Sequence, residues 1–188
     1  MGQAEVQKAL EKLARTLDAG GIPYAIIGAM ALNEFGYRRV TVDIDVLLTP
    51  EGLAAFKAAN LGRGYKESFA GSRSVRDTEH GVDIDVVLAG SYPGDRKPKA
   101  VAFPDPGAVA ERGARVALLP LPLLLELKLA SGMTAPDRLK DLADVQEVIR
   151  INRLPRALAN DLNPFVRGKY LELWQAVEDR SEGMDAAG

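Results

Sequence analysis

Two stretches of this sequence place carboxylates inside otherwise apolar segments. Asp43 and Asp45 are separated by one isoleucine, and so are Asp83 and Asp85. Two residues apart on a β-strand, the acids of a pair lie on one face with Cα atoms about 6.6 Å apart. Like charges held that close in a partly apolar setting are costly unless a cation neutralises them, and Mg²⁺ prefers carboxylate oxygens and phosphates as ligands. The pattern therefore predicts a site for Mg²⁺ or Mn²⁺.

Three carboxylates are enough for such a site, and Asp43 and Asp45 supply two. We expect Asp85 to be the third because three apolar residues follow it as part of a buried strand, with Asp83 as the alternative. Two metals about 3.5–4 Å apart can activate an attacking hydroxyl and neutralise a leaving group. The competing interpretation is surface ion pairing of these acids with Arg38, Arg39, Arg73 and Arg76. It would have to hold for both acidic segments at once.

Gly28 lies fifteen residues before the first acidic pair, between an apolar segment and a run of helix formers. A glycine between a strand and a helix lets backbone N–H groups and the helix N-terminus face an anion. Gly28 and Ala29 therefore become candidates for holding a triphosphate. A simple turn is the alternative at this position.

The composition excludes several other kinds of site. The chain has 188 residues, a formal net charge of −2, no cysteine and a single histidine, His80. Without cysteine there are no thiolate nucleophiles or sulfur-based zinc sites, so any metal must sit on oxygen ligands. The near-neutral charge favours a small-molecule enzyme over an obligate nucleic-acid binder. No run of eighteen apolar residues and no secretion signal is present, so we expect a cytoplasmic protein without a membrane span.

Apolar periodicity, glycine and proline set the expected elements. We expect helices at 3–18, 29–35, 51–60, 120–130, 137–151 and 164–178, and strands at 24–27, 40–48, 65–69, 72–77, 82–88 and 115–118. Strands and helices come first and helices alone follow. This order predicts an α/β (α+β) lobe at 1–118, with a mixed sheet flanked by helices, and a helical lobe at 119–188.

The order of these motifs resembles the polymerase-β nucleotidyltransferase superfamily. The resemblance rests on a glycine turn at 27–29, an Asp-x-Asp strand at 39–46 and a third acidic strand at 84–87. It implies the nucleotidyltransferase fold and transfer of a nucleoside monophosphate from an NTP to an acceptor hydroxyl. It also implies that Asp43, Asp45 and Asp85 hold the metals, and that Arg39 and Thr41 join the glycine turn in binding the nucleotide.

The second half is most similar to the AbiEii-like abortive-infection toxins. The matching segments are 115–118, 124–130 and 138–145. This resemblance implies that Lys128 and Asp141, with Asp144, complete the site, and that Lys128 binds the nucleotide by balancing charge on the triphosphate. It also implies a transfer-RNA end or a protein as acceptor, ahead of a small molecule, and a cognate antitoxin as partner.

The residues of the second half have a plainer interpretation as well. Lys128 follows several leucines in an apolar helix, where a lysine either extends to solvent or meets an anion. Asp141 and Asp144 are three apart and share one helix face, as a solvated or ion-paired surface would. Ala29 stands where the family usually has a second glycine or a serine. A non-catalytic nucleotide- or partner-binding protein of the same fold is therefore the second functional hypothesis, and a purely structural domain is the third.

Overall fold

The computed structural model describes the backbone of residues 2–185 and the side chains of residues 2–180. It divides into two compact units. The α/β unit comprises the chain up to Glu34, Arg38–Ser91 and Phe103–Pro120, and the helical unit comprises Phe35–Tyr37, Tyr92–Ala102 and the chain from Leu121. Each unit is built from more than one segment of the sequence.

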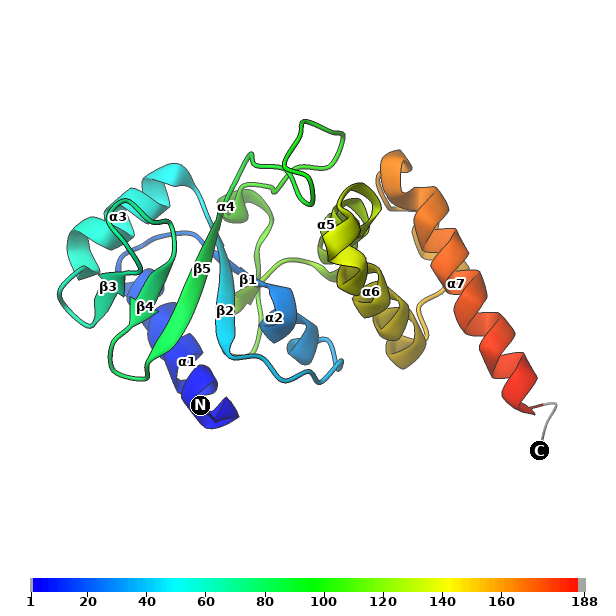
Figure 1. The fold of residues 1–188 in the computed structure, drawn as a ribbon, viewed down its shortest axis with the longest axis horizontal. Helices are drawn as coiled ribbons and strands as arrows, with labels where there is room; N and C mark the ends of the chain where they lie inside the picture. Colours follow the sequence, from blue (N-terminus) through cyan, green and yellow to red (C-terminus); the bar gives the residue numbers. More distant parts are fainter. Residues whose placement is uncertain (1, 186–188) are drawn as a thin grey trace. The chain divides into compact units, whose positions relative to one another are not determined.

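A mixed sheet forms the centre of the α/β unit (Figure 1). Within the described residues it has seven strands in the order β3-β4-β5-β2-β1-β7-β6. Their bounds are β1 Ala25–Ile27, β2 Asp43–Leu48, β3 Tyr65–Glu67, β4 Val75–Asp77, β5 Val82–Leu88, β6 Glu111–Arg112 and β7 Ala117–Leu118. β2 runs parallel to β5 and antiparallel to β1, so the two acidic strands are neighbours in the middle of the sheet.

The helices of the α/β unit are α1 Gln3–Ala19, α2 Gly28–Glu34, α3 Pro50–Asn60 and α4 Pro106–Val109. α1 packs against β2 and β5 with a buried stripe at helical spacing, which includes Leu10, Leu13 and Leu17. Thr49 caps the N-terminus of α3, because its hydroxyl accepts a hydrogen bond from the backbone N–H of Gly52 at 3.0 Å.

The helical unit contains the remaining elements. They are α5 Leu121–Thr134, α6 Leu139–Asn152, α7 Pro164–Asp185 and two 3₁₀ turns, Pro136–Arg138 and Arg156–Asn160. α5 packs against both α6 and α7, and its buried residues lie all round the helix. The predicted fold class, a mixed sheet flanked by helices with helices after it, is confirmed.

The first acidic strand begins later than its sequence suggests. We expected a strand over 40–48, but β2 starts at Asp43. Val40 and Val42 are 73% and 59% exposed, and neither has a partner in the sheet within the described residues. The β-branched residues before Asp43 therefore form an extended segment that no neighbouring strand meets. The short elements α4 and β6 were not predicted, because they are too brief to show a periodicity.

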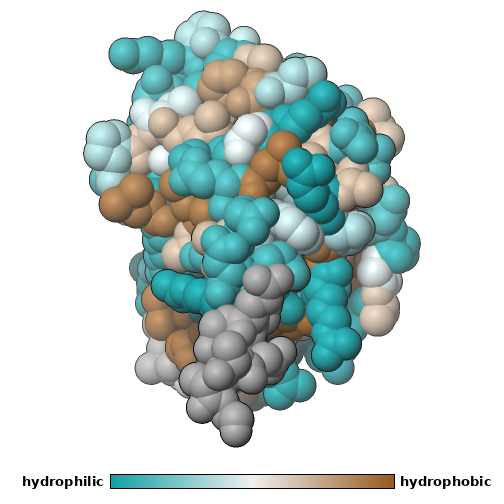
Figure 2. All heavy atoms as spheres, turned by 90° about the vertical axis from the view of Figure 1, so that its right-hand side faces the viewer, coloured by the Kyte–Doolittle hydropathy of each residue, from teal (hydrophilic) through white to brown (hydrophobic). Residues whose placement is uncertain are grey.

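None of the described helices is both long and apolar enough to cross a bilayer. On the face drawn in Figure 2, hydrophobic side chains lie among hydrophilic ones rather than in a single broad patch.

Candidate active site

The four acids of the two predicted segments lie next to each other in the sheet. Asp43 pairs with Asp83, and Asp45 with Asp85, across the parallel β2–β5 ladder. Around the acids, buried residues alternate with them: Ile44 and Val46 on β2, and Val82, Ile84 and Val86 on β5. Because side chains alternate along a strand, the four carboxylates share one face of the sheet. Neighbouring strands are about 4.8 Å apart, a spacing that lets acids on both approach common ions.

Asp83 and Asp85 differ in their neighbours from β4 and the residue before it. Asp83 accepts two hydrogen bonds from Nη1 of Arg76, at 2.8 and 2.7 Å, so the ion-pair interpretation fits this acid. Asp85 instead accepts a hydrogen bond at 2.5 Å from the hydroxyl of Ser74, which carries no charge. Of the two acids, Asp85 is therefore the one whose carboxyl group no basic side chain contacts within the described residues.

Gly28 packs directly against the second acid of β2. It has φ +65°, and a Cβ built on it would lie 1.9 Å from Oδ2 of Asp45. No side chain fits there unless Asp45 moves, and the left-handed backbone conformation itself favours glycine. The first residue of α2 is thus in close contact with the Asp45 carboxylate. Ala29, the next residue, is buried.

Thr41 and Arg39 lie on the extended segment that leads into β2. The hydroxyl of Thr41 donates to Oδ1 of Asp43 at 2.5 Å. The backbone of Arg39 is held by Asn33 of α2, whose Oδ1 accepts from the Arg39 N–H at 2.6 Å and whose Nδ2 donates to its carbonyl at 3.1 Å. The segment is therefore fixed at two points although it belongs to no strand.

Lys128 and Asp141, the site residues predicted in the second half, contact each other inside the helical unit. The Lys128 ammonium lies 2.9 Å from Asp141 and 2.8 Å from Asp144, and Ser131 donates to Asp141 at 2.7 Å. Burial alone would raise the pKa of the Asp141 carboxyl, but the nearby Lys128 charge and the hydrogen bonds from Ser131 and Lys128 lower it. The positive charge of Lys128 is thus balanced by carboxylates of its own unit.

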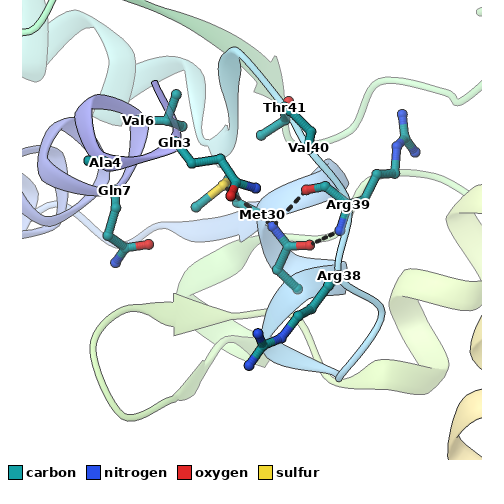
Figure 3. Close-up of a pocket in the computed structure, with 10 residues that line it drawn as sticks. Gln3, Ala4, Val6, Gln7, Met30, Arg38, Arg39, Val40 and Thr41 are labelled. Atoms are coloured by element: carbon teal, nitrogen blue, oxygen red, sulfur yellow. Dashed lines mark hydrogen bonds between the residues drawn. The ribbon is translucent and has the colours of Figure 1, made fainter. Parts of the chain in front are cut away.

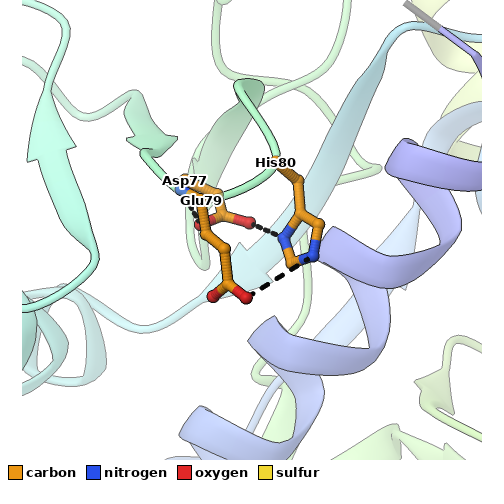
Figure 4. Close-up of side chains that lie close together, drawn as sticks. All are labelled: Asp77, Glu79 and His80. Carbon is orange, nitrogen blue, oxygen red and sulfur yellow. Dashed lines mark hydrogen bonds and ion pairs between the residues drawn. The ribbon is translucent and has the colours of Figure 1, made fainter.

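A second polar cluster was not predicted as a unit (Figure 4). Asp77, Glu79 and His80 are the three described residues of metal-ligand type whose ligand atoms lie within 4.8 Å of one another. Asp77 is fully buried, and its carboxylate contacts the ammonium of Lys12 from α1 and, at 2.6 Å, Nδ1 of His80. The sequence signal was an acid placed where the buried side of β4 should be apolar.

The ammonium of Lys12 makes this cluster an ion-pair network rather than a metal site. Lys12 also lies 3.1 Å from Glu79, so a cation already sits between the two acids. Burial alone would raise the pKa of Asp77, yet the hydrogen bonds from Lys12 and His80 lower it. Burial would likewise lower the pKa of Lys12, and its bonds to Asp77 and Glu79 raise it. Each charge is stabilised by its partners.

The donor set on the acid face of β2 and β5 suits a hard divalent cation. Its side chains offer only oxygen, from the carboxylates of Asp43, Asp45 and Asp85 and from the hydroxyls of Thr41 and Ser74. Oxygen ligands favour Mg²⁺ or Mn²⁺ over zinc. Bound there, such ions would supply charge neutralisation for phosphate oxygens and activation of a hydroxyl.

Known structures share this architecture. A nucleotidyltransferase-like protein from Paracoccidioides brasiliensis is 16% identical, with a TM-score of 0.62 over 99% of this chain and 94% of that one. The antibiotic-resistance factor ANT(2″)-Ia, solved with adenylyl-2″-tobramycin, is 14% identical, with a TM-score of 0.54 over 96% of this chain and 99% of that one. Its solution structure aligns with a TM-score of 0.53 at 14% identity, over 100% and 98% of the two chains.

Sequence comparison adds no relative to these, since no protein-family model and no curated protein matches the chain. Its structural neighbours are nucleotidyltransferases and nucleotidyltransferase-like proteins. The chain therefore has the nucleotidyltransferase fold, and its acidic strands β2 and β5 lie side by side in the central sheet of that fold.

Proposed function

We propose that this protein is a metal-dependent nucleotidyltransferase that moves a nucleoside monophosphate from an NTP to an acceptor hydroxyl. The observation that carries the proposal is the in-register pairing of Asp45 with Asp85, on the same sheet face as Asp43 and with the Gly28 turn packed against Asp45. The fold of the structural neighbours supports it.

Each residue has a distinct role in this proposal. Asp43 and Asp45 hold both metal ions, and Asp85 holds one of them and helps to accept the proton of the attacking hydroxyl. The backbone N–H groups of Gly28 and Ala29 face the triphosphate. Thr41 fixes the carboxylate of Asp43 through its hydrogen bond. Phosphoryl-type transfer depends mostly on such positioning and on charge neutralisation.

Arg39, Lys128 and Asp141 complete the proposed site. Arg39 carries a guanidinium on the segment next to Asp43 and suits a phosphate oxygen. Lys128 and Asp141 remain site residues of this proposal on the AbiEii-like resemblance. Their mutual contact supports a positioning role within the helical unit, since the lysine is engaged by two carboxylates.

The acceptor is the least determined part of the reaction. ANT(2″)-Ia was solved with an adenylylated aminoglycoside, which shows that a small molecule can be the acceptor on this fold. The toxin-like motifs of the second half favour a transfer-RNA end or a protein, a cytoplasmic setting and an antitoxin partner. A non-catalytic nucleotide-binding protein is the second candidate, favoured by Ala29, which has no hydroxyl to offer a phosphate.

Transfer of radiolabel tests the proposal directly. The purified protein is incubated with each α-³²P-labelled NTP, Mg²⁺ or Mn²⁺, and total transfer RNA, a protein extract or an aminoglycoside. We expect one acceptor to be labelled, and Asp43→Asn to abolish labelling while the exposed Asp137→Asn does not. If no NTP raises the melting temperature and Asp43→Asn changes nothing, the enzyme proposal fails. Metal-dependent NTP binding without labelling would favour the non-catalytic candidate.

A further inference from the structure

A pocket of about 540 Å³ opens beside the proposed metal ligands within the α/β unit (Figure 3). It lies between the first turns of α1, the helix α2 and the extended segment at 38–41. Thr41 lines it and donates its hydroxyl hydrogen bond to Asp43, so one residue joins the pocket to the acid face. Ligand pockets in proteins typically measure roughly 300–1,000 Å³, so this one can hold a nucleotide-sized group.

The charge of the pocket points to an anionic ligand. Its lining includes Arg38 and Arg39 and no carboxylate side chain, as far as the described residues go, and the side chains of the two arginines extend in different directions (Figure 3). Arg38 is exposed and makes no ion pair with another described residue. A polycationic acceptor would meet the like charge of Arg38 here, whereas a phosphate would gain charge-assisted hydrogen bonds from its guanidinium.

The rest of the lining suits a planar, partly apolar ring. Met30 and Val40 contribute apolar surface, and a thioether makes favourable contacts with aromatic rings. Val40 is 73% exposed, so a ring placed over it would remove that apolar surface from water. The amide of Gln3 can both donate to and accept from the edge of a nucleobase.

Resting on the proposed function, we infer that this pocket is a nucleotide subsite. It takes a base against Met30 and Val40, with the phosphate of the same nucleotide at Arg38. That nucleotide is either the donor NTP or the terminal nucleotide of a polynucleotide acceptor, and the two sources share this chemistry.

Methionine methyl NMR can test the subsite without metal or turnover. In the ¹³C-methyl-methionine-labelled full chain, Met30 reports on the pocket and Met133 of the helical unit is the internal reference. Met30→Leu assigns the signal, and the probe is AMP in the presence of a chelator. We expect a saturable shift of the Met30 signal and none of the Met133 signal.

Two pairs of variants make the result specific. Ala4→Trp fills the pocket from an exposed position and should abolish the Met30 shift, whereas Ala19→Trp, exposed at the other end of α1, should not. Arg38→Ala should weaken AMP binding about tenfold, because one charge-assisted hydrogen bond is lost. Arg63→Ala, at an exposed arginine outside the pocket, should leave AMP binding unchanged. A Met30 signal that does not respond to millimolar AMP, or responds equally in Ala4→Trp, overturns the inference.

A second titration separates the two sources of the nucleotide. If Mg²⁺ with a non-hydrolysable ATP analogue shifts the Met30 signal and AMP then adds nothing, the subsite belongs to the donor. If the analogue binds without moving the signal and AMP still moves it, the subsite belongs to the acceptor. Failure of the proposed function would give a different pattern. ATP binding would then be insensitive to Mg²⁺ and to Asp43→Asn, while AMP would still shift the Met30 signal.

Discussion

Asp45 on β2 and Asp85 on β5 are direct partners across a parallel ladder, and both side chains lie on the face of the sheet opposite to the buried Ile44 and Ile84. Parallel neighbours in register place their side chains side by side rather than on opposite faces. Asp43 lies one step away along β2 on that same face. Three carboxylates from two adjacent strands thus meet the basic geometric requirement for sharing a pair of metal ions.

The different partners of Asp83 and Asp85 lead to a first prediction. Asp85→Asn should reduce nucleotidyl transfer at least about a hundredfold, since charge stabilisation at a metal site is worth several kcal/mol. Asp83→Asn should change it less than about threefold, because it loses only an exposed ion pair with Arg76. Steady-state rates of both variants with the labelled acceptor provide the measurement. Equal losses would mean that the choice between the two acids was wrong.

The closeness of Gly28 to Asp45 gives a second prediction, with a glycine elsewhere as its control. Gly28 and Gly62 both have positive φ, but a Cβ on Gly62 would meet nothing within 4 Å. Both alanine variants should therefore lose about 1–2 kcal/mol from backbone strain. Gly28→Ala should in addition displace the Asp45 carboxylate and weaken Mg²⁺·ATP binding at least about tenfold, or about 1.4 kcal/mol. Urea unfolding and calorimetry measure the two effects, and an unchanged affinity in Gly28→Ala would contradict the role given to this contact.

The buried pair of Lys12 and Asp77 gives a third prediction, on stability and pH. Asp77→Asn should destabilise the protein by about 3 kcal/mol at neutral pH, because it leaves the Lys12 ammonium without its buried partner. The pKa of Asp77 is lowered below its ordinary value of 3.8. Its contribution is therefore fully present above that value and is lost as the pH falls through the lowered pKa.

The measurement for this pair is urea unfolding of the wild type and Asp77→Asn between pH 7 and pH 3. The difference in unfolding free energy should be constant down to about pH 4 and should shrink below it. The exposed Asp161→Asn serves as the control and should show little difference at any pH. A difference that grew on acidification would refute the assignment.

The contacts of Lys128 give a fourth prediction. Lys128→Met should lower the unfolding free energy by about 3–5 kcal/mol, because Asp141 and the buried Asp144 lose the ammonium that contacts both. Adding Asp144→Leu to Lys128→Met should recover part of this loss, whereas the exposed Lys140→Met should cost almost nothing. A double-mutant cycle measures the coupling. If Lys128→Met abolished transfer at unchanged stability, a direct role on the triphosphate would replace the positioning role.

Much of the α/β unit was predictable because its strands carry strong local patterns. The alternation of acid and apolar residues marks β2 and β5 and identifies the face on which the acids lie. Each of Asp83 and Asp85 lies between two apolar residues, so only the apolar run after Asp85 favoured it in the sequence. In the structure they differ in their partners, Arg76 of β4 and Ser74 just before β4, and such neighbours are a tertiary property.

Other features depended on contacts that no local pattern encodes. Val40 and Val42 have high strand propensity, but β2 begins only at Asp43 because no strand lies beside them. Asp77 lies on the same side of β4 as the buried Val75, which marks its position as unusual for an acid but does not identify its partner. Its burial against Lys12, 65 positions away in the sequence, was not predictable from either segment alone.

The pairing of β1 with β7 has a consequence for how the protein is made. Ile26 and Leu118 are partners in the sheet although about half the chain separates them. On the ribosome, β1 can meet β2 soon after both emerge, but its other edge stays open until β7 has been synthesised. Closing so distant a contact is slow, and an unpaired apolar edge invites pairing with another chain. The nascent α/β unit should therefore depend most on chaperones in the interval between the emergence of β5 and that of β7.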